Sequence, residues 1–281
     1  MGKGNRLRTE RRLTAQATAE EEALVRRTRK EALDQGAAEG KQRGCLFCRR
    51  NDRSFTSEEH IFPEGLGNTE HILPVGVVCD ACNNGALSQV DEALQGFLPI
   101  ELLRTWHGVP SKSGSLPSFK FNNGVLRCLS PGELDLSLDS AKGQPATQHL
   151  DGGRVKTGFT AARNDGSPRR LRNVHRALLK MVVEYAWVDL GEAGALDAKF
   201  DHIRDRVLNG GYAGYLAFPE RSNPSETIQF QYARRTRTSD GHPLVGLLAS
   251  FWGFPIFTDS LFPEPPKGVP PGWSMHHFAS V

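Results

Sequence analysis

The sequence lacks the features that would place the protein in a membrane or outside the cell. It has no run of about 18 apolar residues, the length that a membrane-spanning helix needs. Its first residues, MGKGNRLRTERRL, are charged where a secretory signal needs an apolar stretch. We therefore expect a cytoplasmic protein that is neither exported nor bound to a membrane.

A repeat and a strong charge of one sign are also missing. The 29 glycines and 17 prolines are scattered without a fixed period, which argues against collagen-like or repeat architecture. Lys and Arg number 35 against 32 Asp and Glu, for a formal net charge of +3. Any contact with nucleic acid should therefore come from local basic patches. With 281 residues, 38% of them hydrophobic, the chain can form one large domain or two small ones.

Five cysteines are present, and their spacing is informative. Cys45 and Cys48 form one C-x-x-C pair, and Cys79 and Cys82 form another. In a secreted chain two disulfides would explain such pairs, but reduced thiols in the cytoplasm favour a metal ion. We predict a structural Zn²⁺ site of four cysteines. Cys128 lies in an alternating, strand-like stretch and should be a small buried residue without chemistry.

The pattern predicts an α+β protein in four parts. The helices expected from charge pairing or apolar periodicity cover about residues 9–38, 169–190 and 200–208. Alternation predicts strands near 118–121, 125–128 and 228–232, and Asp240-Gly241 predicts a hairpin turn into an apolar run over 244–257. The expected parts are a charged helical arm (1–40), a cysteine module (41–98) that ends at Pro99, a larger α+β domain with strands from Pro99 onward (99–262), and an extended Pro-rich tail (263–281).

The cysteine module holds a second motif. Thirty residues separate Cys48 from Cys79, more than a simple zinc ribbon needs, and they contain the sequence EHIFP at 59–63. After Cys82, Leu87, Val90 and Leu94 recur at helical spacing. The second cysteine pair should therefore stand at the start of a helix, with Asn83 in its first turn.

The order C-x-x-C, acidic-His-Ile-x-Pro, C-x-x-C-Asn resembles the zinc-stapled branch of the HNH endonucleases, which have the treble-clef-like ββα-metal fold. The resemblance covers residues 45 to 98. It implies that His60 is the general base that activates water, and that Glu59 and Asn83 hold a catalytic Mg²⁺ or Mn²⁺ ion. It also implies that Cys45, Cys48, Cys79 and Cys82 hold the structural zinc, and that cleavage leaves a 5′-phosphate and a 3′-hydroxyl.

Elementary chemistry is compatible with these roles. A neutral imidazole can take a proton from water, and carboxylate and amide oxygens suit a hard divalent ion. Adjacent strand residues point to opposite faces, however, so Glu59 and His60 can face one phosphate only if the backbone bends. A module this small would need zinc as a staple.

The sequence departs from the family pattern at two places. Glu59 stands where Asp is more usual in the family, and the family's middle Asn has no match, so Asn68 and Asn84 are the candidates to replace it.

Two further residues of the module, His71 and Asp91, have two interpretations each. His71 is an exposed loop residue or a phosphate contact, and Asp91 is a solvated carboxylate or an outer group of the site. Trp106 and His107 are expected to be packing residues. Each remaining basic group is either a solvated surface or a phosphate contact, and for the helix face at Arg172, His175 and Arg176 we expect the solvated surface. The other two groups are the run Arg234–Arg237 and the N-terminal arm with Lys3, Arg6, Arg8, Arg11 and Arg12.

The sequence thus predicts a metal-dependent endonuclease, with DNA favoured over RNA and a setting in bacterial restriction or antiphage defence. The N-terminal helix or the C-terminal domain would make a protein contact or a homo-oligomer. The alternative from another class is a non-catalytic treble-clef zinc-finger module that binds nucleic acid or protein. A third reading is an RNA-processing nuclease.

Overall fold

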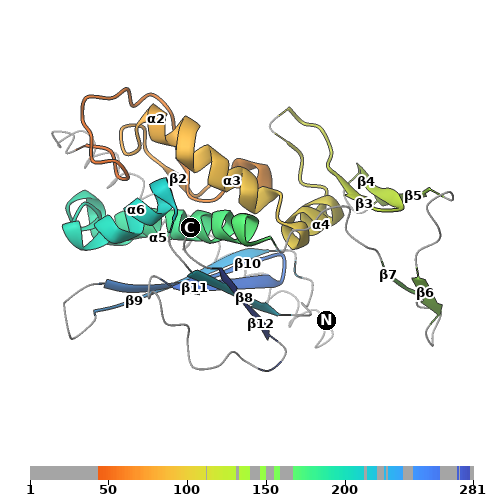
Figure 1. Ribbon diagram of the computed structural model, residues 1–281. Coiled ribbons are helices and arrows are strands. Elements are labelled where there is room, and N and C mark those ends of the chain that lie inside the picture. Colours follow the sequence, from red (N-terminus) through yellow and green to blue (C-terminus); the bar gives the residue numbers. More distant parts are fainter. Residues whose placement is uncertain are drawn as a thin grey trace, which may run out of the picture. The chain divides into compact units, whose positions relative to one another are not determined.

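The computed structural model describes most of the chain from the first cysteine onward (Figure 1). The chain divides into two units, Met1–Gly44 and Cys45–Val281. The helix and the basic arm expected before residue 40 lie outside the described residues. These residues are 44–111, 113–130, 133–139, 146–149, 155–158, 167–211, 214–219, 225, 227–236, 243–259, 271 and 273–278.

A short hairpin and a helix follow the first cysteine pair. The helical stretch is continuous from the second cysteine pair, although its middle part has the wider π-helical winding. Leu87, Val90 and Leu94 are fully buried along it, which confirms the predicted apolar face. The elements are β1 (Glu59–His60), η1 (Glu64–Leu66), β2 (Ile72–Leu73), α2 (Asp80–Cys82), η2 (Asn83–Leu87) and α3 (Ser88–Gln95).

The segment after the module begins with a helix, where strands were expected. Pro99 stands in the first turn of α4 (Leu98–His107), a position where proline's missing N–H costs no helical bond. Two small antiparallel sheets follow, and Cys128 is buried in one of them as predicted. Their strands are β3 (Ser118–Phe121), β4 (Gly124–Ser130) and β5 (Glu133–Leu138), then β6 (Ala146–His149) and β7 (Val155–Gly158).

The predicted long helix is confirmed as α5 (Pro168–Ala195). Pro168 opens it after the cap residue Ser167, whose side chain accepts a hydrogen bond from the Arg170 backbone N–H. Gly191 interrupts the helical backbone with φ 69°. The short turn η5 (Ala198–Phe200) then leads into α6 (Asp201–Asn209), which ends at Gly210 as the Asn-Gly-Gly sequence predicts.

The last part of the chain forms a five-stranded antiparallel sheet in the order β12-β8-β11-β10-β9. The apolar run over 244–257 forms two strands, because Trp252 and Gly253 both have positive φ and make a tight turn. Part of the extended end is the strand β12, which pairs with β8. The strands are β8 (Gly214–Pro219), β9 (Ile228–Thr236), β10 (Pro243–Phe251), β11 (Phe254–Asp259) and β12 (Trp273–Phe278).

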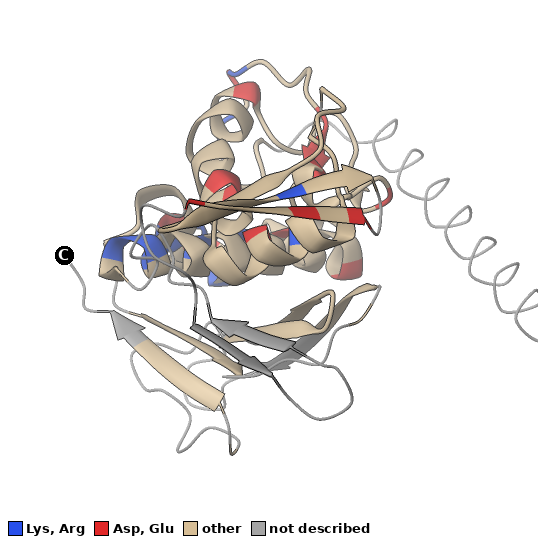
Figure 2. Ribbon diagram, turned by 90° about the vertical axis from the view of Figure 1, so that its right-hand side faces the viewer, with Lys and Arg blue, Asp and Glu red and all other residues tan. Residues whose placement is uncertain are grey.

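Helix α5 is the middle layer of the fold. It contacts β8, β10, β11 and β12 of the sheet, and it also contacts α3 of the cysteine module and α6. Figure 1 shows α2 and α3 on one side of α5 and the sheet on the other. All residues from Ala177 to Glu184 are consequently buried, charged ones included. In Figure 2 the Lys and Arg segments of the helical layers gather mainly toward one end, and Asp and Glu segments are spread more widely.

Candidate metal and nuclease site

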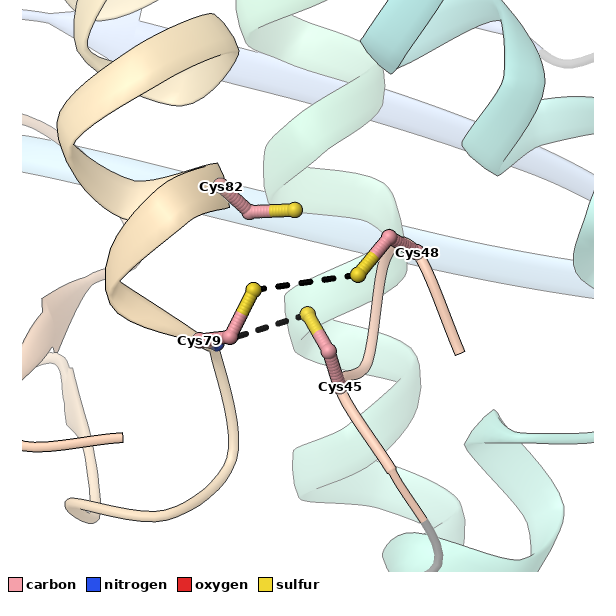
Figure 3. Close-up of side chains that lie close together, drawn as sticks. All are labelled: Cys45, Cys48, Cys79 and Cys82. Atoms are coloured by element: carbon pink, nitrogen blue, oxygen red, sulfur yellow. Dashed lines mark hydrogen bonds between the residues drawn. The ribbon is translucent and has the colours of Figure 1, made fainter. Parts of the chain in front are cut away.

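The four paired cysteines meet at one point (Figure 3). Their sulfur atoms all lie within 4.8 Å of one another, and Cys48 Sγ lies 3.7 Å from Cys79 Sγ. Four sulfurs around one zinc ion at about 2.3 Å would lie about 3.8 Å apart. The cysteines therefore fit a tetrahedral metal site, and all of them are free of disulfides.

The cysteine side chains share hydrogen bonds with one another and with the backbone. A hydrogen bond with the Cys82 side chain lowers the pKa of Cys45 to about 5, and the same interaction raises the pKa of Cys82. The backbone N–H groups of Phe47 and Cys79 also donate to the Cys45 sulfur, each at 3.4 Å. A bound divalent ion would replace the shared protons, as metal binding by thiolates requires.

His60 stands on the short hairpin formed by β1 and β2. Strand β1 pairs antiparallel with β2, with His60 opposite Ile72 and Glu59 opposite Leu73. The His60 side chain is 19% exposed, and its Nε2 lies 3.8 Å from Glu64 Oε2. Among the described residues its buried Nδ1 has no hydrogen-bond partner. The imidazole is thus partly open, with one ring nitrogen uncommitted.

Glu59 points the other way, as strand alternation requires. Its side chain is 3% exposed and its Oε1 lies 2.7 Å from Lys180 Nζ, which comes from α5. Among the described residues, the buried Oε2 has no hydrogen-bond partner. The structure therefore places the carboxylate in a buried ion pair, on the opposite side of the strand from the exposed part of His60.

Asn83 links the helical stretch after the second cysteine pair to the hairpin. Its Nδ2 donates a hydrogen bond of 2.8 Å to the carbonyl oxygen of Glu58, the residue just before β1. This bond engages the amide nitrogen, so the amide oxygen is the atom that can meet a cation. The predicted neighbours His60 and Asn83 are thus on adjacent elements.

Asp80 fixes the approach to the hairpin. Its carboxylate accepts hydrogen bonds from the backbone N–H and the hydroxyl of both Thr56 and Ser57, at 2.8 to 2.9 Å. Hydrogen bonds from Ser54, Ser57 and Thr56 lower the pKa of Asp80 well below its usual range, so it accepts these bonds as an anion.

Asn68 organises the loop between the strands. Its Nδ2 donates to the carbonyl oxygens of Phe62 and His71, and its Oδ1 accepts from the N–H groups of Glu70 and His71. The side chain is 1% exposed. Of the two candidates for the missing middle Asn, Asn68 makes these loop bonds, whereas Asn84 is exposed.

Three residues that the sequence prediction left out contact the site. Asp91, read as more often solvated, binds Lys180 Nζ with both oxygens at 2.9 and 3.0 Å. Lys180 received no role, because a lysine within a helical pattern gives no sign that it will be buried. Glu64 lies 3.8 Å from His60 Nε2. Its position four residues after His60 was the only feature of the sequence that could have indicated this contact.

The remaining expectations have mixed outcomes. The solvated face predicted at His175 is wrong, because α5 lies between two layers: His175 is buried, and burial lowers its pKa to about 3. Arg176 donates to the carbonyl oxygens of Val207 and Leu208. His107 stacks on Trp252, with ring centroids 5.4 Å apart, as a packing residue does.

The expectations for Trp106, His71 and the basic run Arg234–Arg237 also have different outcomes. Trp106, also expected to pack, is 56% exposed. His71 is exposed, and its Nδ1 lies 3.4 Å from the Tyr185 hydroxyl. The side chains of Arg234–Arg237 lie outside the described residues.

The comparisons with known proteins agree with the sequence motif. A family model described as HNH endonuclease matches residues 45–97. Searches of curated proteins and of solved structures found no match. Among the described residues, no helix is both long and apolar enough to cross a membrane. The predicted resemblance is therefore confirmed: the segment 45–97, with its four-cysteine site, hairpin and helix, matches the HNH endonuclease family.

Proposed function

We propose that the protein is a metal-dependent endonuclease that hydrolyses phosphodiester bonds in nucleic acid. The observation that carries the proposal is the placement of His60, partly open on a hairpin tied to Asn83, within the segment that matches the family model. A preference for DNA and a setting in restriction or antiphage defence rest on the resemblance alone.

The proposed chemistry divides between His60 and a divalent ion. The imidazole of His60, whose side chain is 19% exposed, would take a proton from the attacking water, and Glu64, 3.8 Å from Nε2, would favour the imidazolium that results. A bound Mg²⁺ or Mn²⁺ ion would supply charge stabilisation at the phosphate. The Asn83 amide oxygen fits such an ion. The Glu59 carboxylate fits less well, since one oxygen is bound to Lys180.

The test is supercoiled-plasmid cleavage with Mg²⁺ or Mn²⁺, comparing the wild type with His60→Ala. We expect nicking that EDTA stops and that falls by about 100-fold or more in His60→Ala, since general-base catalysis contributes about 10² to 10⁴. Zinc content and the circular dichroism spectrum should be unchanged. The control is His202→Ala on α6, which should cleave like the wild type. Equal trace cleavage by wild type and His60→Ala would indicate contamination and contradict the proposal.

A non-catalytic zinc-binding module is the second candidate, and the buried Glu59–Lys180 pair favours it because the pair occupies one expected metal ligand. It predicts one zinc per chain, nucleic-acid or protein binding, and indifference to His60→Ala. RNA substrates in the same assay separate the RNA-processing alternative.

A further inference from the structure

Lys180 reaches from α5 into the nuclease module. It is fully buried, and its Nζ lies 2.7 Å from the His60 carbonyl oxygen and 2.7 Å from Glu59 Oε1. The Asp91 carboxylate on α3 lies at 2.9 Å. An ammonium group has three N–H donors, and these three partners can use all of them. One side chain thus joins β1, α3 and α5.

The charges around Lys180 explain why it stays ionised. Although burial alone would lower its pKa, the carboxylates of Asp91, Glu184 and Glu59 raise the pKa of Lys180 above its usual value. Burial raises the pKa of Glu184 well above the usual range for a carboxyl group. Glu184 lies 3.8 Å from Nζ, farther than Glu59 at 2.7 Å and Asp91 at 2.9 Å. The closest ion pairs of Lys180 are therefore with Glu59 and Asp91.

The paired part of the hairpin is short. Strands β1 and β2 contain two residues each, too few for a hairpin to be stable by itself. Lys180 binds the side chain of Glu59 and the carbonyl of His60, so it fixes both residues on either side of one peptide bond. The imidazole of His60 projects from the strand that is anchored in this way.

We propose that Lys180 is a positioning residue of the nuclease site: its buried ammonium anchors Glu59 and the His60 backbone, so that a helix outside the family-matched segment completes the site. The inference rests on the proposed function. The inference also assigns Glu59 to the anchor: its carboxylate binds Lys180, and other groups bind the divalent ion.

The test compares wild type, Lys180→Met and Val182→Ala in the full-length protein. Val182 is a fully buried neighbour on α5 that lies outside the charged cluster, so its truncation lowers stability without touching the anchor. Cleavage is measured well below every melting temperature and expressed per zinc-loaded, folded molecule. We expect kcat to fall by about 100-fold in Lys180→Met, the effect of a displaced catalytic group, with KM for DNA unchanged. Val182→Ala should keep the wild-type kcat.

A second pair of variants covers the case in which Lys180→Met does not fold. Lys180→Met combined with Glu59→Gln removes the buried pair together, and Asp91 remains 19% exposed to water. We expect this variant to fold, bind zinc and have the same low kcat. Glu59→Gln alone should lower kcat but leave the half-saturating Mg²⁺ concentration unchanged. If Glu59 were a metal ligand, its replacement would raise that concentration.

The outcomes separate the two proposals. A wild-type kcat in folded Lys180→Met or in the double variant would overturn the positioning role while the nuclease function stands. A raised Mg²⁺ requirement in Glu59→Gln would restore Glu59 as a ligand and overturn the anchor assignment. If the wild type cleaves neither DNA nor RNA, the proposed function fails and the positioning role fails with it.

Discussion

His175 shows how a single side chain depends on the layers around it. It lies among buried residues of α5, and burial together with the nearby positive charge of Arg206 lowers its pKa to about 3. In the unfolded chain the pKa of a histidine is about 6.5. Between these two values the unfolded state binds the proton and the folded state does not, so stability falls as the pH decreases.

We therefore predict that the wild type loses about 2 kcal/mol of unfolding free energy through His175 between pH 7.5 and pH 5. His175→Gln removes the titrating group and should lack this part of the pH dependence. Urea denaturation at the two pH values measures the difference between the proteins. The matched control is His202→Gln on α6, a half-buried histidine, which should retain the wild-type dependence. Parallel pH curves for wild type and His175→Gln would show that the prediction is wrong.

At the scale of the element, the loop between β1 and β2 depends on one amide. The Asn68 side chain makes four hydrogen bonds to the backbone of the loop, at 2.7 to 3.2 Å. Gly67 has φ 85° and allows the chain to turn just before it. These bonds set the path of the backbone that leaves His60.

We predict that Asn68→Ala lowers the unfolding free energy by about 2 to 3 kcal/mol, because buried backbone groups lose their partners. It should also reduce kcat by about 10-fold or more, because the His60 strand becomes less well placed. Thermal melting and plasmid cleavage measure the two effects. Asn84→Ala, an exposed residue on η2, is the control and should change stability by less than about 0.5 kcal/mol. Equal effects of the two variants would contradict the role of Asn68.

At the scale of the whole molecule, α5 is shared by two bodies. The cysteine module packs on one side of it and the five-stranded sheet on the other. Arg204 extends the connection, since its Nε donates to the carbonyl oxygen of Leu46 between the first two cysteines, at 2.7 Å. Loss of the metal site should consequently destabilise more than the module.

We predict that Cys79→Ser abolishes zinc binding and lowers the melting temperature by about 10 °C or more, since several kcal/mol of metal binding contribute to folding. Differential scanning calorimetry and a zinc assay test this. Cys128→Ser is the matched control: it replaces a lone buried thiol on β4 that donates to the Ser130 carbonyl, a bond that a hydroxyl can also make. A Cys79→Ser protein with wild-type zinc content and melting temperature would contradict the four-cysteine site.

The sequence by itself determined the local features of this protein. The two C-x-x-C pairs predicted the metal site, the periodicity predicted α5 and α6, and the acidic-His motif predicted the matched family. These features depend on the spacing of residues that are close in sequence, and that spacing can be read directly from the sequence. The same local reasoning missed the helix α4, which has Pro99 in its first turn and stands where strands were expected.

Only the tertiary structure decided which charged residues are buried and what they bind. Lys180 lies 120 residues after His60 in the chain and 89 residues after Asp91, and Asp91 lies 31 residues after His60. Only the packing of α5 against the module brings the three together. The strand period sends Glu59 inward and His60 outward, but the partner that Glu59 meets depends on which helix covers that face. Burial of a charge is a property of surrounding layers, so local sequence carries no signal for it.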